Sequence, residues 1–158
     1  IAVRHVIRYT KKQFGGTMSF LADEALQNSF VEALNKNDAF RTQALAFDGS
    51  VLLEVDEDRL WLKIYKGEVI DSDTEVPVFG YTFKFCGPEA NWRYLLDGTK
   101  LWADLTFPGK RYFDDDPNLE RVGEMSVDIT TEGNLLEAGR LTEAMFELAY
   151  TLRDVASK

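Results

Sequence analysis

The sequence has 158 residues and a formal net charge of −9, with 27 Asp and Glu residues against 18 Lys and Arg. A chain of this length is the size of one domain and can bury enough surface for a stable core. Nucleic-acid binding and docking on anionic membranes both depend on Lys and Arg side chains, so the acidic balance disfavours these two functions.

No segment is typical of a membrane span or of a secretory signal. The longest apolar runs are only a few residues, such as Val51 to Leu53, whereas a helix that crosses a bilayer needs about 20. The single cysteine, Cys86, allows no intrachain disulfide. We therefore expect a cytoplasmic protein without an integral membrane segment.

The first residues predict an extended arm ahead of the folded domain. Apolar and basic side chains alternate over residues 1–10, which is typical of a strand or an extended segment. The pair Gly15-Gly16 then breaks the pattern. The expected organisation is an arm over residues 1–16 and a single domain over residues 17–158.

Two helices are expected next. Thr17 can cap a helix whose apolar positions recur at helical spacing from Met18 to Leu34. The polar stretch over residues 35–38 is expected to end or bend this helix, and residues 39–46 favour a short second one.

The apolar period then changes from helical to alternating. Apolar side chains alternate over residues 51–55 and 60–64 on either side of an acidic turn, which predicts a β-hairpin. Lys66-Gly67 is typical of a second turn, which a short strand over residues 68–71 and an acidic loop are expected to follow.

The strongest strand pattern places four aromatic residues on one face. They are Phe79, Tyr81, Phe83 and Phe85. Pro88 suits the first turn of a following helix, which Gly98 is expected to end. Ordinary core packing and the wall of a ligand cavity both explain such an aromatic face, and the residues alone leave the two interpretations open.

The C-terminal part predicts a connection, a strand and a helix. From Thr99 to Gly123 the pattern weakens, as in a functional connection or a lid. The alternating residues of the last expected strand are Met125, Val127 and Ile129. Asn134 and Glu137 resemble a capping box at the start of a terminal amphipathic helix. This order of elements favours an α+β fold with a largely antiparallel sheet backed by helices.

The residues needed for catalysis or metal binding are scarce. The only histidine, His5, lies in the arm, and we interpret Cys86 as a small buried hydrophobic residue rather than a nucleophile. Acidic clusters over residues 56–58, 71–73 and 114–116 lack the spacing of a calcium-binding loop. No glycine-rich phosphate-binding loop is present. We expect no catalytic residue, no metal site and no cofactor.

Two segments of the second half have a recognisable order of elements. In the run YTFKFCGPEANWRYLLDG, from Tyr81 to Gly98, an alternating strand passes through a short turn into a helix that ends at glycine. Further on, GEMSVDI from Gly123 to Ile129 is followed by the turn Gly133-Asn134-Leu135 and the last helix. Over about residues 18–155, this order resembles the type 2 sterol carrier protein family.

The resemblance implies a five-stranded, mostly antiparallel sheet with helices packed on one face, enclosing an apolar tunnel. Domains of this family bind sterols, fatty acids, acyl thioesters or other lipids and are not enzymes on their own. The ligand-binding residues that the resemblance implies are Phe83, Phe85, Trp92, Leu95, Leu96, Leu135, Met145 and Leu148, with Trp102 and Phe107 near the tunnel mouth. The expected function is therefore non-catalytic binding or transfer of an apolar ligand.

The alternative is a protein-interaction module on the same fold. In that reading the core is filled and binds no lipid. The N-terminal arm, or an exposed aromatic patch near Trp102 and Phe107, would then contact a protein partner or a second copy of the chain.

Overall fold

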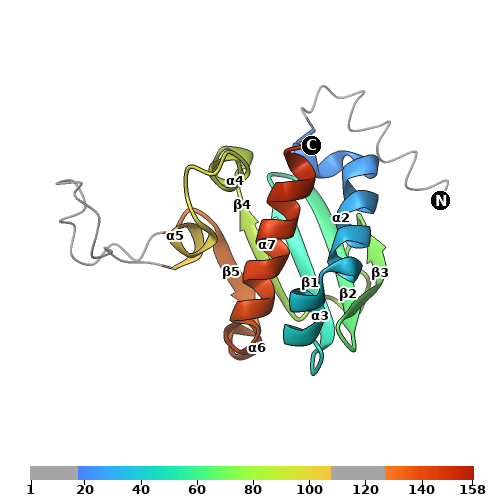
Figure 1. Ribbon diagram of the computed structural model, residues 1–158. Helices are drawn as coiled ribbons and strands as arrows, with labels where there is room; N and C mark the ends of the chain where they lie inside the picture. Colours follow the sequence, from blue (N-terminus) through green and yellow to red (C-terminus); the bar gives the residue numbers. More distant parts are fainter. Residues whose placement is uncertain (1–17, 108–126) are drawn as a thin grey trace.

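The computed structural model describes residues 18–107 and 127–158 (Figure 1). The expected arm over residues 1–16 and the cap at Thr17 lie outside these ranges, as does most of the connection expected from Thr99 to Gly123. In chain order the elements are η1 (Phe20–Ala22), α2 (Glu24–Lys36), α3 (Asp38–Gln43), β1 (Asp48–Val55), β2 (Asp58–Tyr65), β3 (Glu68–Asp73), β4 (Phe83–Gly87), α4 (Glu89–Leu96), α5 (Trp102–Thr106), β5 (Thr130–Gly133), α6 (Leu135–Arg140) and α7 (Thr142–Ala156).

Side-chain caps set the first two helices. The side chain of Asp23 accepts a hydrogen bond from the N–H of Ala25 at 3.0 Å, so α2 begins after Asp23 and not at Met18 as expected. The side chain of Asn37 accepts from the N–H of Phe40 at 3.1 Å and caps α3. The predicted break between two helices at this point is confirmed.

The five strands form one sheet in the order β3-β2-β1-β4-β5. Three neighbouring pairs are antiparallel, and the central pair of β1 and β4 is parallel. The predicted α+β class and the mostly antiparallel, five-stranded sheet are therefore confirmed, and the hairpin of β1 and β2 lies where the alternating pattern placed it. The parallel pair arises because the chain between β3 and β4 brings β4 beside β1 in the same direction.

The main core lies between the sheet and the helices. In Figure 1, α2, α3 and α7 lie across one face of the sheet. The hairpin contributes six alternating residues to this core, all of them buried: Val51, Leu53, Val55, Leu60, Leu62 and Ile64. Phe30 and Phe40 pack against the sheet from α2 and α3, and Leu148 from α7. Burial of this apolar surface, at about 25 cal/mol per Å², supplies most of the stabilisation.

The opposite face of the hairpin carries a smaller buried pair. Leu52 and Trp61 lie opposite each other in the β1–β2 register, and both are buried outside the main core. The ring of Phe79 meets the ring of Trp61 edge-on, with centroids 5.8 Å apart. The connection between β3 and β4 therefore packs against the face of the sheet that the helices leave free.

The aromatic strand is shorter than its sequence pattern. Strand β4 begins at Phe83, so the prediction that Phe79 and Tyr81 belong to the same strand is wrong. The N–H of Gly80 bonds to the carbonyl oxygen of Pro77 at 2.8 Å, which closes a turn at this point. Phe79 is 79% exposed, since it packs on Trp61 and not in the core.

The last strand also begins later than expected. Strand β5 spans Thr130–Gly133, while Val127 and Ile129 precede it and Met125 lies outside the described residues. Ile129 is buried, and its N–H bonds to the carbonyl oxygen of Leu105 in α5 at 2.9 Å. Ile129 is therefore a core residue that ties α5 to the start of β5.

Candidate functional site

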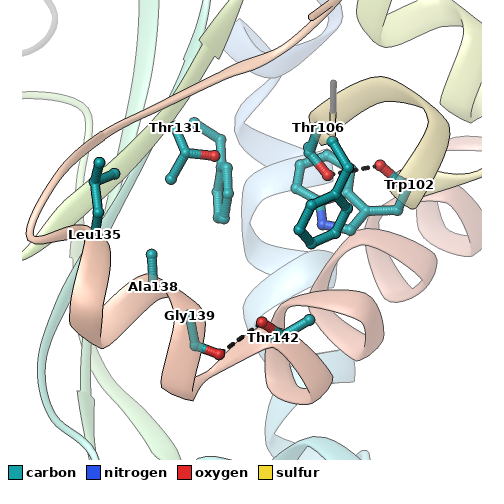
Figure 2. Close-up of a pocket in the computed structure, with 9 residues that line it drawn as sticks. Trp102, Thr106, Thr131, Leu135, Ala138, Gly139 and Thr142 are labelled. Carbon is teal, nitrogen blue, oxygen red and sulfur yellow. Dashed lines mark hydrogen bonds between the residues drawn. The ribbon is translucent and has the colours of Figure 1, made fainter. Parts of the chain in front are cut away.

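An apolar pocket opens where β4 and β5 meet the helices α5, α6 and α7. Its volume is about 190 Å³. Figure 2 shows the side chains around it. The lining residues are Phe85, Trp102, Thr106, Phe107, Thr131, Leu135, Ala138, Gly139 and Thr142.

The α5 wall is built on stacked aromatic rings. The ring of Trp102 meets Phe85 edge-on with centroids 4.9 Å apart, and it lies 5.8 Å from the ring of Trp92 behind it. The side chain of Asp104 accepts from the N–H of Leu101 at 3.0 Å and holds the first turn of α5. The position of the Trp102 ring is thus set by the core on one side and the helix start on the other.

A tight turn from β5 into α6 forms the opposite wall. Gly133 has φ +101°, and a Cβ there would lie 2.8 Å from the carbonyl oxygen of Thr82, so the turn requires glycine. The next residue, Asn134, donates its N–H to that same oxygen at 2.8 Å. Its side chain accepts from the N–H of Glu137 at 3.1 Å, which confirms a helix start at this point. The single terminal helix expected from here is wrong, because the chain breaks at Leu141 into the short α6 and the longer α7. Leu135, at the first position of α6, is therefore held at the pocket rim.

Among the described residues, the polar side chains that line the pocket are three threonines. Thr106 donates to the carbonyl oxygen of Trp102 at 2.9 Å, and Thr142 donates to that of Gly139 at 2.7 Å. Both bonds are drawn in Figure 2. Within the described ranges, Thr131 has no side-chain hydrogen bond, and none of the lining residues is charged. The site is thus apolar, with weak and neutral polar groups.

Comparison with solved structures identifies the fold. The crystal structure of sterol carrier protein 2 matches with a TM-score of 0.59 and 17% sequence identity, covering 85% of this chain and 98% of that one. The chain has a sterol-carrier-like fold. A conserved hypothetical protein from Thermus thermophilus, described as a possible sterol carrier protein, matches with a TM-score of 0.55 and 18% identity, covering 87% of this chain and 92% of that one. No protein-family model and no curated protein matches the sequence.

Within this sterol-carrier-like fold, the ten residues predicted to bind ligand fall into two groups. Four of them line the pocket: Phe85, Trp102, Phe107 and Leu135. The others lie in or against the main core: Phe83, Trp92, Leu95, Met145 and Leu148 are buried there, and Leu96 is half-buried against it. The pocket therefore occupies only the α5–α6 end of the expected tunnel wall.

Five pocket residues were not predicted from the sequence, namely Thr106, Thr131, Ala138, Gly139 and Thr142. Ala138 and Gly139 are adjacent small residues on α6, and a Cβ built on Gly139 would meet no atom within 4 Å. These two small residues are the one sequence signal for the pocket, because small side chains leave open space in front of a buried wall. The threonines carry no signal, because isolated threonines are common in strands and helix ends.

Cys86 lies on β4 and is only half-buried, not buried as expected. The thiol is half-buried, and burial raises its pKa above the ordinary value for cysteine. It therefore stays a protonated thiol at neutral pH. In the described ranges no group of three or more His, Cys, Asp or Glu side chains could hold a metal ion, and no helix there is long and apolar enough to cross a membrane.

A half-buried ionic cluster lies on the β4 face away from the pocket. The ammonium of Lys84 pairs with Glu54 at 3.0 Å and with Glu132 at 3.2 Å, linking β1, β4 and β5. The hydrogen bond to Glu54 is the largest cause that holds the pKa of Lys84 above its ordinary value of 10.5. The cluster joins the central parallel pair to the edge strand that carries Thr131.

Replacing Lys84 with methionine is expected to lower the free energy of unfolding by about 1–2 kcal/mol, because Glu54 would lose its closest partner. Since the folded-state pKa of Lys84 is raised, its stabilising effect is fully present below the ordinary pKa and is lost as pH rises above it. Urea unfolding of both proteins should show a constant difference between about pH 7 and 9 and a smaller one above about pH 10.5. A difference that grows with pH would contradict this assignment.

Proposed function

We propose that this domain binds an apolar ligand in the pocket between α5, β5 and α6 and carries it without catalysis. The ligand class is a lipid, in the broad sense that includes sterols, fatty acids and acyl thioesters. The observation that carries the proposal is an apolar pocket at the sheet–helix boundary of a fold similar to sterol carrier protein 2. Burial of apolar surface would drive binding, and the threonine hydroxyls would orient the ligand.

The size of the pocket limits what it encloses. Its volume of about 190 Å³ is close to that of cavities of ~150 Å³ that bind benzene, and below the ~300–1,000 Å³ of drug-sized sites. A ring or a short stretch of alkyl chain would fit inside. The remainder of a longer ligand would lie along the rim, where Phe107 is 50% exposed and Leu135 is 61% exposed.

The cellular setting that we propose is the cytoplasm. The single cysteine is a free thiol, and a free thiol persists most readily in a reducing compartment. The formal net charge of −9 argues against nucleic acid as a partner. The alternative role is binding to a protein partner or to a second copy of the chain, and native mass spectrometry distinguishes this role from carriage of a ligand.

Native mass spectrometry of the purified full chain, followed by organic extraction and lipid analysis, tests the proposal. A co-purifying apolar molecule at near-stoichiometric amount, or loading with added fatty acids and sterols, is the expected result. A clean apo mass that resists loading would overturn the proposal. Such a result, together with a stable dimer or a captured partner, would favour an interaction module with a filled core.

Two adjacent leucines provide a matched pair of variants. Leu135 lines the pocket rim, whereas Leu136 is 84% exposed and is not among the lining residues. Leu135→Asp is expected to weaken ligand binding by at least about tenfold, because the carboxylate replaces apolar contact surface. Leu136→Asp is expected to leave the affinity unchanged, as measured by titration with the ligand class that loads.

Both substitutions should leave the fold intact. The two side chains are mostly exposed, and a carboxylate in the first turn of a helix is electrostatically tolerated. Thermal unfolding of both variants serves as the control. Equal affinity in the two variants would place the ligand away from the α6 rim and contradict the assignment of this pocket.

A further inference from the structure

In the part of the chain that the structure describes, the pocket walls offer hydroxyl groups and no charge, and this restricts which polar group a ligand can carry into the pocket. We propose that the pocket selects a neutral apolar ligand that carries a hydroxyl group, in preference to an ionised carboxylate of the same chain length. This inference rests on the proposed function and narrows the ligand class of the same site. The hydrogen-bonding capacity of three lining residues carries it: Thr106, Thr131 and Thr142.

Two of the three hydroxyl protons are already engaged by backbone carbonyl groups. The proton of Thr106 is engaged by the carbonyl oxygen of Trp102, and the proton of Thr142 by that of Gly139. Each of these oxygens therefore faces a ligand as an acceptor only. Thr131 has no side-chain partner in the described part of the chain, so its hydroxyl can donate or accept. The pocket thus presents two committed acceptors and one free donor.

A ligand hydroxyl matches this set, and a carboxylate does not. An alcohol donates one hydrogen bond, which Thr106 or Thr142 can accept, and it can accept one from Thr131. A carboxylate only accepts, so the two committed acceptors would repel it and a single donor would remain. In the figure Thr131 lies across the pocket from Thr106 and Trp102, so the donor and one acceptor approach from opposite walls (Figure 2).

No cation near the pocket is free to balance a negative charge among the described residues. Arg140, the basic residue of α6, pairs with Glu137 at 2.7 Å. Lys84, on the strand that carries Phe85, is directed to the opposite face of the sheet and pairs with Glu54 and Glu132. Burying an ionised carboxylate without a cation is costly, so an ionised ligand would be rejected or would have to bind in its protonated form.

Decan-1-ol and decanoate provide a matched pair of probes, and n-decane serves as the reference without a polar end. Isothermal titration of the full chain near pH 7.5 should give at least about tenfold tighter binding of the alcohol than of the acid. Since only the protonated acid suits the pocket, the affinity for decanoate should rise by up to about tenfold for each pH unit lowered towards its carboxyl pKa. Equal affinities of alcohol and acid, without pH dependence, would overturn the inference.

A second variant pair tests the role of the free donor. Thr131→Val keeps the shape and strand propensity of the side chain but removes its hydroxyl, and should weaken decanol binding by roughly 3- to 10-fold. Binding of n-decane should not fall. The matched control is Thr130→Val on the same strand, whose exposed hydroxyl donates to the carbonyl oxygen of Cys86 at 3.3 Å on the other face. This control should leave both affinities unchanged.

The outcomes separate the two proposals. If n-decane binds and the alcohol gains nothing over the acid, the pocket is an apolar site without hydroxyl selection and only this inference fails. An unchanged decanol affinity in a folded Thr131→Val variant would also overturn it. If none of the three probes binds, the proposed function and this inference fail together.

Discussion

Replacing Trp92 with alanine is expected to lower the free energy of unfolding by about 3–5 kcal/mol, the usual range for deleting a buried aromatic side chain. Trp92 is fully buried, and its ring lies 5.8 Å from that of Trp102. Its indole N–H donates to the carbonyl oxygen of Glu54 in β1 at 3.1 Å. The substitution would therefore leave a large cavity and remove the hydrogen bond that joins α4 to the end of β1. Urea unfolding measured by circular dichroism checks the value.

The control is Leu96→Ala on the same helix. Leu96 is only half-buried against the core, so its loss should cost less than about 2 kcal/mol. Trp92→Phe separates packing from hydrogen bonding, because it keeps an aromatic ring and removes the N–H, at an expected cost of about 1–2 kcal/mol. A loss below about 1 kcal/mol for Trp92→Ala would mean that the neighbouring rings close the cavity.

Trp92 also supports the pocket without lining it. The ring of Trp102 is held between Trp92 and Phe85, so Trp92→Ala is expected to let the α5 wall shift and to weaken ligand binding in the fraction that stays folded. The sequence-based prediction placed Trp92 at the ligand itself. The structure places it one layer behind, and this position could not be predicted because a stripe at helical spacing shows which face is buried but not what covers it.

Elements with local patterns were predicted well from the sequence. The β1–β2 hairpin has alternating residues on both arms and an acidic turn, and all of these signals are close together in the chain. The start of α6 at Asn134 and the break at Asn37 follow from caps, which are equally local. Local signals of this kind do not depend on the tertiary structure.

The strand boundaries that depend on contacts with distant residues were predicted less accurately from the sequence. Phe79 belongs by alternation to the aromatic strand, yet it lies outside β4 because Trp61, 18 residues earlier in the chain, offers it a surface on the other face of the sheet. Ile129 alternates with Val127, yet its N–H bonds to Leu105 in α5 and not to a strand. In both cases a long-range contact overrides a local period of two.

The candidate pocket likewise has one part that the sequence predicted and another part that depends on the tertiary structure. Its aromatic wall, Phe85 with Trp102, was predicted from the resemblance to the type 2 sterol carrier protein family, since the aromatic pattern alone left core packing and a ligand wall open. The space in front of that wall comes from Ala138 and Gly139 on α6, which are small and reach the pocket only through the turn at Gly133. An open volume is a property of several elements together, so no single segment of the sequence predicts it.

Replacing Gly67 with alanine is expected to lower the free energy of unfolding by about 2–5 kcal/mol. Gly67 has φ +76° in the two-residue turn between β2 and β3, where a left-handed backbone costs a residue with a side chain ~1–2 kcal/mol. In addition, a Cβ on Gly67 would overlap the backbone carbonyl oxygen of Arg41 at the end of α3. A backbone atom cannot rotate away as a side chain can, so α3 and the turn would have to separate, which adds the usual ~1–3 kcal/mol of overpacking.

The neighbouring residue is the matched control, because it adds neither cost. Lys66 also has a positive φ, 50°, and already carries a Cβ, so Lys66→Ala should change stability by less than about 0.5 kcal/mol. Lys66→Asn should even be slightly stabilising, because Asn-Gly is the preferred pair for a turn with two left-handed residues. If Gly67→Ala costs only about 1–2 kcal/mol in urea unfolding, the left-handed backbone alone accounts for the loss, and the contact with Arg41 is loose. A loss above about 2 kcal/mol at Gly67 would show that this backbone-to-backbone contact positions α3 against the sheet.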